Sequence, residues 1–332
     1  MTSPTDALTV AVTGPTGTFG HGLMPLLQND DRVSRVVGIA RRPFDPADEG
    51  WTKMEYRRGD VRDETTLKDA FSGADVVVHL AFIIVGGQRE LVRDINVEGT
   101  LNAFRAAAAA GVKRFVYASS VAAYGFHRDN PVGMREDWPV RPADRLFYAQ
   151  EKAELEQLLE QESAAHPELE LYLLRPPVVL GPHTVGGKQV LPGPFAPLNR
   201  YLQGGIRRLP VPVVGLVPDI PLQFIHEDDV GQALLQCVVG AGPAGAYNIA
   251  GDGVLSLADV ARELRVFPLK VGARPVQAAA RAVSRLPFLP TAAEWVEAFS
   301  HPAIMDTTRA KEELGWTPRY TGLEALQDTL NR

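Results

Sequence analysis

The chain has 332 residues with 40 acidic and 34 basic side chains, a net charge of −6 and no basic run, which argues against nucleic acid or an anionic membrane as a partner. Its one cysteine, Cys237, excludes an intrachain disulfide, fits a reducing compartment and lies in an apolar helical pattern typical of a core position. With neither a signal segment nor an apolar run of about 18 residues, a cytoplasmic protein is predicted.

The first predicted unit is a strand over residues 8–13, a glycine-broken turn and a helix over residues 22–28. Gly14, Gly17 and Gly20 recur at three-residue intervals. Gly14 permits a tight turn, Gly17 lets the backbone approach a pyrophosphate, and Gly20 lets helix and strand pack closely. Alone the triplet is a weak signal, because any strand–turn–helix unit can carry it.

A second buried strand is predicted over residues 33–40, and it ends in Arg41 and Arg42. In dinucleotide folds an acidic residue at this strand end binds the ribose hydroxyls of NAD, whereas a nearby Arg accommodates the 2′-phosphate of NADP. Neither Ala40 nor Arg41 is acidic, so NADP is the expected cofactor and NAD the alternative. The plainer interpretation of both arginines is a pair of solvated surface charges.

Strand-like and helix-like segments then alternate, which predicts an α/β fold with a doubly wound parallel sheet of the Rossmann type. Further strands are expected at residues 54–59, 76–80, 115–120 and 171–180, and helices at residues 67–71, 96–110 and 146–161. Ligands bind at the carboxyl ends of such strands, which is where His79, Ser119 and Ser120 stand.

The second half of the chain is less regular. Residues 181–221 are too rich in proline and glycine for a sheet interior, although a short helix is expected around residues 198–203. A strand at 224–226, a helix at 228–239, a strand at 247–250 and a helix capped by Ser256 and ending at 264 follow. We expect a dinucleotide-binding domain over residues 1–180 and about 224–250, and a smaller, irregular C-terminal substrate-binding lobe over residues 181–223 and about 251–332.

Tyr148 and Lys152 are spaced i and i+4, so both lie on one face of the predicted helix. An ammonium, together with an oxidised nicotinamide, would lower the pKa of a phenol from its usual value near 10. Such a tyrosine can exchange a proton with a hydroxyl while hydride moves to or from the nicotinamide, and Ser120 can hold the reacting oxygen. By itself the Tyr-x-x-x-Lys spacing is more typical of a surface pair.

The ordered combination of motifs is far more specific. It runs T-G-P-T-G-T-F-G at 13–20, D-V at 60–61, H-L-A at 79–81, N-V-E-G-T at 96–100, Y-A-S-S at 117–120, A-Y-G at 123–125, Tyr148 to Lys152, L-R-P at 174–176 and F-I-H-E-D-D-V at 224–230. The closing D-T-T-R-A-K at 306–311 and L-G-W-T-P at 314–318 belong to the same series. Over nearly its whole length the chain resembles the extended short-chain dehydrogenases/reductases, the NAD(P)-dependent epimerase/dehydratase family.

The resemblance implies that Ser120, Tyr148 and Lys152 are the catalytic triad. It also implies that Asp60 and Val61 contact the adenine ring, that Ala81 lines the nicotinamide ribose, and that Asn96 lies near the active-site lysine. His226 and Asp229 are expected to support a loop, and no metal ligand is expected. The full set expected to bind the cofactor is Gly14, Thr16, Gly17, Thr18, Phe19, Arg41, Arg42, Asp60, Val61, Leu80, Ala81, Asn96, Tyr148, Lys152, Pro176 and Val178.

Departures from the family patterns narrow the reaction. Sugar-nucleotide 4,6-dehydratases carry Asp-Glu directly after the active Ser/Thr, where this chain has Val121 and Ala122. Epimerases that invert a carbon beside a ketone use a Cys/His-type pair, and no cysteine stands near the site. Sugar-nucleotide members commonly grip the diphosphate with an Arg at the position of Leu222, although Arg207 or Arg208 could serve instead.

Three functions remain open. The favoured one is an NADP(H)-dependent reductase or dehydrogenase acting on a carbonyl/secondary-alcohol pair of a small, fairly apolar metabolite. The second is a sugar-nucleotide 4-epimerase that retains NAD. The third is a redox-sensing binding protein, against which the complete triad argues, since such proteins usually lose the tyrosine. The resemblance also allows a homodimer that pairs through the helices of Asn96 and Tyr148.

Overall fold

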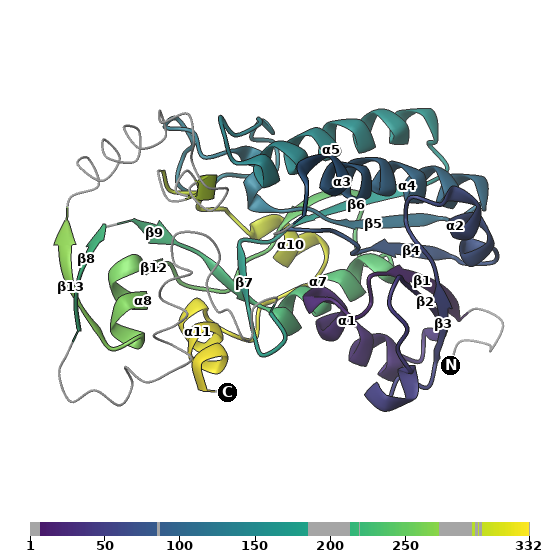
Figure 1. The fold of residues 1–332 in the computed structure, drawn as a ribbon, viewed down its shortest axis with the longest axis horizontal. Helices are drawn as coiled ribbons and strands as arrows, with labels where there is room; N and C mark the ends of the chain where they lie inside the picture. Colours follow the sequence, from purple (N-terminus) through teal and green to yellow (C-terminus); the bar gives the residue numbers. More distant parts are fainter. Residues whose placement is uncertain are drawn as a thin grey trace.

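The structure is a computed structural model, and it describes residues 7–84, 87–184, 213–218, 220–271, 294, 295, 298 and 301–331. Its centre is one seven-stranded sheet with strand order β11-β6-β5-β4-β1-β2-β3, all neighbours parallel (Figure 1). The strands are β1 (Leu8–Thr13), β2 (Val33–Ala40), β3 (Met54–Arg58), β4 (Val76–His79), β5 (Arg114–Ala118), β6 (Glu170–Arg175) and β11 (Gly245–Asn248). The doubly wound parallel sheet predicted from the sequence is thereby confirmed.

Helices cover both faces of this sheet. One face carries α2 (Glu64–Phe71), α4 (Gly99–Ala109) and α5 (Phe147–Ala165), and the other carries α1 (Thr18–Asn29) and α7 (Glu227–Val238) (Figure 1). Alternation along β1 explains the two cores, because Val10 and Val12 pack on the α1 and α7 side while Ala11 packs on the α4 side. Cys237 of α7 lies fully buried in the first core, as its apolar setting predicted.

The helices α1 and α7 touch backbone to backbone. A Cβ added to Gly22 would lie 2.2 Å from the Glu227 carbonyl oxygen, and one added to Gly231 would lie 2.1 Å from the Gly22 carbonyl oxygen. Real Cβ atoms do not approach so closely, so each position excludes any side chain. The close packing of these two helices therefore depends on both glycines.

Several predicted boundaries are wrong in an instructive way. The first helix begins at Thr18, directly after the turn, so Gly20 and Gly22 lie inside α1. A Cβ at Gly20 would lie 1.9 Å from the Pro15 carbonyl oxygen, so this glycine packs the helix on its own turn instead of on the strand. The helix predicted from residue 96 begins earlier, as α3 (Arg89–Arg93), a π-helical turn η2 (Asp94–Glu98) and then α4.

The strand predicted over residues 171–180 is two strands, because Pro176 and Pro177 interrupt it. Its first part is β6, and its second part, β7 (Val178–Leu180), leaves the main sheet and pairs in parallel with β10 (Phe224–His226). The short 3₁₀ turns η1 (Pro46–Glu49) and η3 (Val121–Tyr124) follow β2 and β5.

Beside the main sheet lies a smaller region of short elements (Figure 1). Two more two-stranded pairs occur there, β9 with β12 and β8 with β13. Ser256 caps α8 through a reciprocal hydrogen-bonded box with Asp259, as predicted. The expected helix at 198–203, Arg207 and Arg208 lie outside the described residues. The elements of this region are β8 (Val213–Pro218), β9 (Pro221–Leu222), β12 (Leu255–Ser256), α8 (Leu257–Glu263), β13 (Val266–Val271) and α11 (Gly322–Asn331), whereas α10 (Thr308–Glu313) packs on the core of the main sheet through Ala310.

Candidate active site

The sheet reverses its winding between β1 and β4, and a dinucleotide crevice is expected at their carboxyl ends. The turn after β1 depends on Gly14, whose φ is +70° and whose added Cβ would lie 3.0 Å from the Ala81 backbone. Gly17 is exposed and is the N-cap of α1, where a glycine supplies no side-chain cap. Both features suit a phosphate group.

His79, at the end of β4, ties the two strands together below this crevice. Its Nδ1 lies 2.9 Å from Thr13 Oγ1 and its Nε2 lies 3.1 Å from Thr100 Oγ1. Burial, with a smaller contribution from Lys152, lowers the pKa of His79 to about 3, so the ring is neutral. His79 therefore has a structural role at the end of β4, and we do not expect it to take part in a reaction.

The residues expected to hold the adenosine half are spread along one edge. Arg41 and Arg42 are exposed, and within the described chain neither makes an ion pair. Asp60 accepts two hydrogen bonds from the Arg62 guanidinium, at 3.0 and 2.7 Å, and one from the Arg62 backbone amide at 3.0 Å, and these hold the pKa of its carboxyl low. Val61 is buried, against the position of Gly99 in α4.

The remaining residues expected to bind the cofactor differ in their burial and in their hydrogen bonds. Thr16 is exposed, whereas the Thr18 hydroxyl donates a 2.9 Å hydrogen bond to the His183 carbonyl. The Pro176 carbonyl accepts from the Val121 amide at 2.9 Å, which joins the end of β6 to the turn after β5. Phe19 packs partly on the core, Leu80 and Ala81 are partly buried, and Val178 is exposed.

The three residues of the proposed triad come from two neighbouring elements. The end of β5 places Ser120 as the N-cap of η3, where its Oγ accepts from the Ala122 amide at 3.1 Å. The first two turns of α5 place Tyr148 and Lys152 on one helix face. Ser120 lies close enough to Tyr148 to lower the pKa of its phenol, which brings the two elements together at the site.

Burial dominates the electrostatics of the two key groups. It raises the pKa of Tyr148 to about 12, an effect that Ser120 only partly opposes. Lys152 makes hydrogen bonds to Tyr117 Oη at 2.9 Å and to the Ala118 carbonyl at 2.8 Å. Burial lowers the pKa of Lys152 to about 7. In the chain alone, burial of both groups therefore outweighs their proximity, and the lowering of the phenol pKa by an ammonium together with an oxidised nicotinamide stays a prediction.

Aromatic side chains surround the two groups. The Phe82 ring lies with its centroid 3.7 Å from Lys152 Nζ and meets Tyr148 edge-on at 5.8 Å. The indole of Trp295 stacks on the other side of Tyr148 at 5.5 Å. The neighbouring Glu294 forms an ion pair with Arg89 of α3. Within the described chain, the surroundings of the phenol are thus largely apolar.

A buried polar network lies directly behind the triad, and sequence reasoning missed it. Glu156, one turn after Lys152, accepts hydrogen bonds from Arg175 at 2.5 to 3.0 Å and from the Ser119 hydroxyl. Arg175 also donates to Tyr124 Oη at 2.6 Å, and that hydroxyl donates to Asn248 at 2.8 Å. An arginine at the end of an apolar strand was the available signal, because a buried charge needs a partner.

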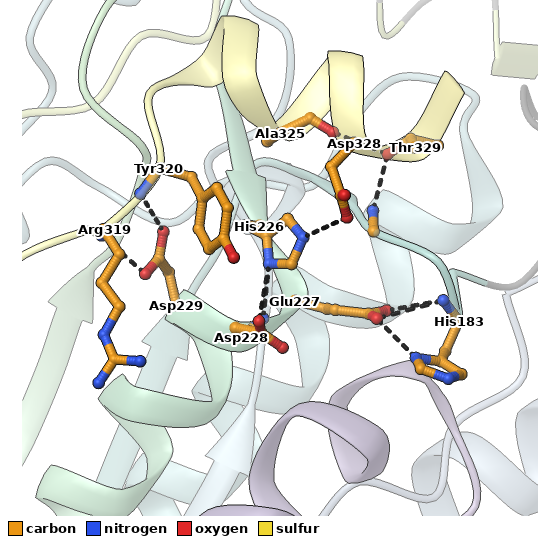
Figure 2. Close-up of polar contacts among 11 residues, drawn as sticks. His183, His226, Glu227, Asp228, Asp229, Arg319, Tyr320, Ala325, Asp328 and Thr329 are labelled. Carbon is orange, nitrogen blue, oxygen red and sulfur yellow. Dashed lines mark hydrogen bonds and ion pairs between the residues drawn. The ribbon is translucent and has the colours of Figure 1, made fainter. Parts of the chain in front are cut away.

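His226 and Asp229 support the C-terminal segment, as expected. Figure 2 shows His226 between two carboxylates, with its Nε2 3.2 Å from Asp328, while its ring stacks on Tyr320 at 4.0 Å. Asp229 accepts from the backbone amides of Arg319 and Tyr320 at 2.8 and 3.1 Å. These contacts join the start of α7 to the chain before α11.

The buried carboxylate of Glu227 makes a second link in the same view. It faces His183, with 2.7 Å between Oε1 and Nδ1 (Figure 2). Two features are not found among the described residues: a group of three His, Cys, Asp or Glu side chains placed to hold a metal ion, and a helix with the length and apolar character to cross a membrane.

Known proteins resemble this chain along most of its length. A model described as the NAD dependent epimerase/dehydratase family matches residues 10–250. An uncharacterized protein of Mycobacterium tuberculosis strain H37Rv is 28% identical over 325 residues, covering 96% of this chain and 82% of the relative. Sterol demethylase protein B of Methylococcus capsulatus is 30% identical over 212 residues, covering 61% of this chain and 62% of the relative.

Among solved structures, MoeE5 in complex with UDP-glucuronic acid and NAD is similar throughout. It is 25% identical with a TM-score of 0.72, and the match covers 97% of this chain and 98% of MoeE5.

Proposed function

This chain belongs to the NAD dependent epimerase/dehydratase family, the extended short-chain dehydrogenases/reductases, and from that membership we propose that it is an NADP(H)-dependent reductase or dehydrogenase. Its substrate pair is a carbonyl and a secondary alcohol of a small, fairly apolar metabolite. The observation that carries the proposal is that Ser120 lies close enough to Tyr148 to lower the pKa of its phenol, at the carboxyl edge of the sheet, with Lys152 one helical turn away.

In this proposal Tyr148 Oη exchanges a proton with the substrate oxygen. A phenol with its pKa raised to about 12 is protonated at neutral pH, so Tyr148 is ready to donate toward a carbonyl oxygen. Ser120 orients the phenol and the substrate oxygen. When bound, the nicotinamide supplies or accepts the hydride.

The residues present fit a dinucleotide. The positive φ of Gly14 and its approach to the Ala81 backbone shape the turn, and the uncapped start of α1 offers amide groups to a pyrophosphate. The cofactor would be held by the set named from the sequence, from Gly14 to Val178. We assign the cofactor to residues 1–180 with about 224–250, and the substrate to residues 181–223 with about 251–332.

NADP preference is proposed on Arg41 and Arg42, which are exposed at the end of β2. Replacing both with Gln is expected to lower the affinity for NADPH about 10- to 100-fold, since charge-assisted contacts to a phosphate would be lost. The affinity for NADH is expected to change by less than about threefold. Fluorescence titration measures both affinities.

The matched control for that test is Arg105→Gln with Lys113→Gln, which removes two exposed cations on α4 and at the start of β5. Equal losses for NADPH and NADH in the Arg41/Arg42 variant would reject the proposed role.

An apolar substrate is supported by the aromatic surroundings of Tyr148, namely Phe82 and Trp295. Leu222 also supports an apolar substrate, because sugar-nucleotide members commonly carry an arginine at this position. Leu222 packs in an apolar cluster beside Phe224. The similarity to sterol demethylase protein B also fits an apolar substrate.

The second candidate is a sugar-nucleotide 4-epimerase with retained NAD, which the similarity to MoeE5 bound to UDP-glucuronic acid and NAD favours. One experiment separates the two. The purified protein is denatured and assayed for released NAD, and the native protein is followed at 340 nm with NADPH and a panel of cyclic and aromatic ketones. A reductase consumes NADPH; an epimerase releases tightly bound NAD, converts UDP-glucose and gives no net change in absorbance.

A further inference from the structure

Glu151 is a buried carboxyl group directly before Lys152 in α5, and the triad does not account for it. Only 1% of the residue is exposed. Its Oε2 accepts a 2.9 Å hydrogen bond from Asn96 Nδ2, while its Oε1 is buried with no hydrogen-bond partner among the described residues. A buried oxygen left in this state is unfavourable for folding, so the position needs a reason other than stability.

Glu151 fixes an asparagine that holds the segment after β4. Asn96 Nδ2 also donates to the Ile83 carbonyl at 2.9 Å, and Asn96 Oδ1 accepts from the Ile83 amide at 2.8 Å. Both backbone groups of Ile83 are therefore held by one side-chain amide. Asn96 lies in the π-helical turn η2, a kind of local widening that is frequent at functional sites.

The segment that Asn96 holds covers the reacting centre. Phe82 precedes Ile83, and its ring lies over Lys152 Nζ and against the edge of Tyr148. A ring at 3.7 Å from an ammonium stabilises the charged form and shields it from water. A shift of Ile83 would therefore move the group that covers Lys152.

The charges around Lys152 are unevenly distributed. Glu156 and Glu151, both on α5, raise the pKa of Lys152 against its burial. The other titratable groups facing the ammonium are Tyr117 of β5, Tyr148 of α5 and the neutral His79 of β4.

Glu151 itself is faced by few charges. Arg93 of α3 and Lys152 favour its ionised form, while Glu154 and burial oppose it. Arg175 and Ser119 donate hydrogen bonds to the carboxylate of Glu156. Of these two carboxyl groups on α5, Glu151 is therefore the one with an oxygen that has no hydrogen-bond partner among the described residues.

We propose that Glu151 is a positioning residue of the reacting centre: through Asn96 it fixes Ile83, and with it Phe82, over Lys152. The inference rests on the proposed function only in the role that it gives Lys152. This positioning part can be measured separately from a charge part, the effect of the Glu151 carboxylate on the protonation of Lys152.

Hydrogen exchange tests the positioning part without any ligand. Glu151→Ala removes the acceptor of Asn96, and the Ile83 amide is expected to exchange at least about tenfold faster, since its own acceptor is no longer fixed. Glu151→Gln keeps an acceptor oxygen and should exchange within about threefold of the wild type. Glu162→Gln, at a partly exposed position on the same helix that pairs with Arg105, is the control. Wild-type exchange at Ile83 in Glu151→Ala would overturn this part.

The pH dependence of NADPH binding tests the charge part. Affinity, followed by nucleotide fluorescence from pH 6 to 9, is expected to fall as Lys152 loses its proton. A carboxylate favours a neighbouring ammonium, so Glu151→Gln should lower the midpoint of this fall by about half a pH unit or more, and Glu162→Gln should not. An unmoved midpoint in Glu151→Gln would overturn the charge part. A wild-type protein that binds neither NADPH nor NADH would instead refute the proposed function, and the exchange result would still decide the positioning part.

Discussion

The Tyr148→Phe variant is expected to lose turnover by about 10²- to 10⁴-fold while its affinity for NADPH changes by less than about threefold. The phenol is the group that exchanges a proton with the substrate oxygen, and Phe preserves the ring that packs between Phe82 and Trp295. The variant lacks the Tyr148 hydroxyl, which is the proposed proton donor, and Ser120 is not expected to take over that role. Turnover is followed at 340 nm with the best ketone of the panel, and affinity by nucleotide fluorescence.

Tyr172→Phe is the matched control for that loss. The Tyr172 hydroxyl, in β6, donates to the Gly242 carbonyl at 2.8 Å, away from the triad. Its removal should change turnover by less than about twofold. Full activity in Tyr148→Phe, or an equal loss in both variants, would rule out the proposed role of Tyr148.

Breaking the Glu156–Arg175 pair should have the largest effect on stability. Both side chains are almost fully buried, and Glu156→Gln would leave the Arg175 guanidinium without its counter-charge in the core. Loss of one partner from a buried pair costs about 3–5 kcal/mol of unfolding free energy. Urea denaturation followed by circular dichroism measures the change, provided that the transition is reversible.

Two comparisons sharpen this test. Glu162→Gln breaks an exposed pair on the same helix and should cost no more than about 1 kcal/mol. The double variant Glu156→Met with Arg175→Met removes both charges and should be more stable than Glu156→Gln, because no unpaired charge remains. If Glu156→Gln proves as mild as the exposed control, the network does not stabilise the fold in this way.

Local patterns made much of the fold predictable. The buried strands β1 and β2 have the bounds that their apolar runs indicated, because a short apolar run between turn residues leaves little choice of conformation. The helix of Tyr148 and Lys152 was placed correctly because the i, i+4 spacing fixes both side chains on one face. The start of α1 was missed because the glycines that favour a turn also pack inside the helix.

The environment of the site was much less predictable. Phe82 meets Lys152, Glu151 meets Asn96 and Glu156 meets Arg175 only because separate strands and helices converge, and no local pattern encodes those distances. The effect of burial on the pKa of Tyr148 could not be predicted for the same reason: the sequence shows which charges are near in the chain, but not how much water the folded site excludes.

The glycine contact between α1 and α7 limits how this protein can be divided. The helix that follows the glycine-rich turn after β1 rests on a helix contributed just over two hundred residues later, at a separation that admits no side chain on either partner. A shortened chain ending after β6 would keep every motif of the nucleotide half and yet expose the groove that α7 fills. The residues up to the end of β6 are therefore not expected to fold by themselves, because α7, which comes later in the sequence, completes their packing.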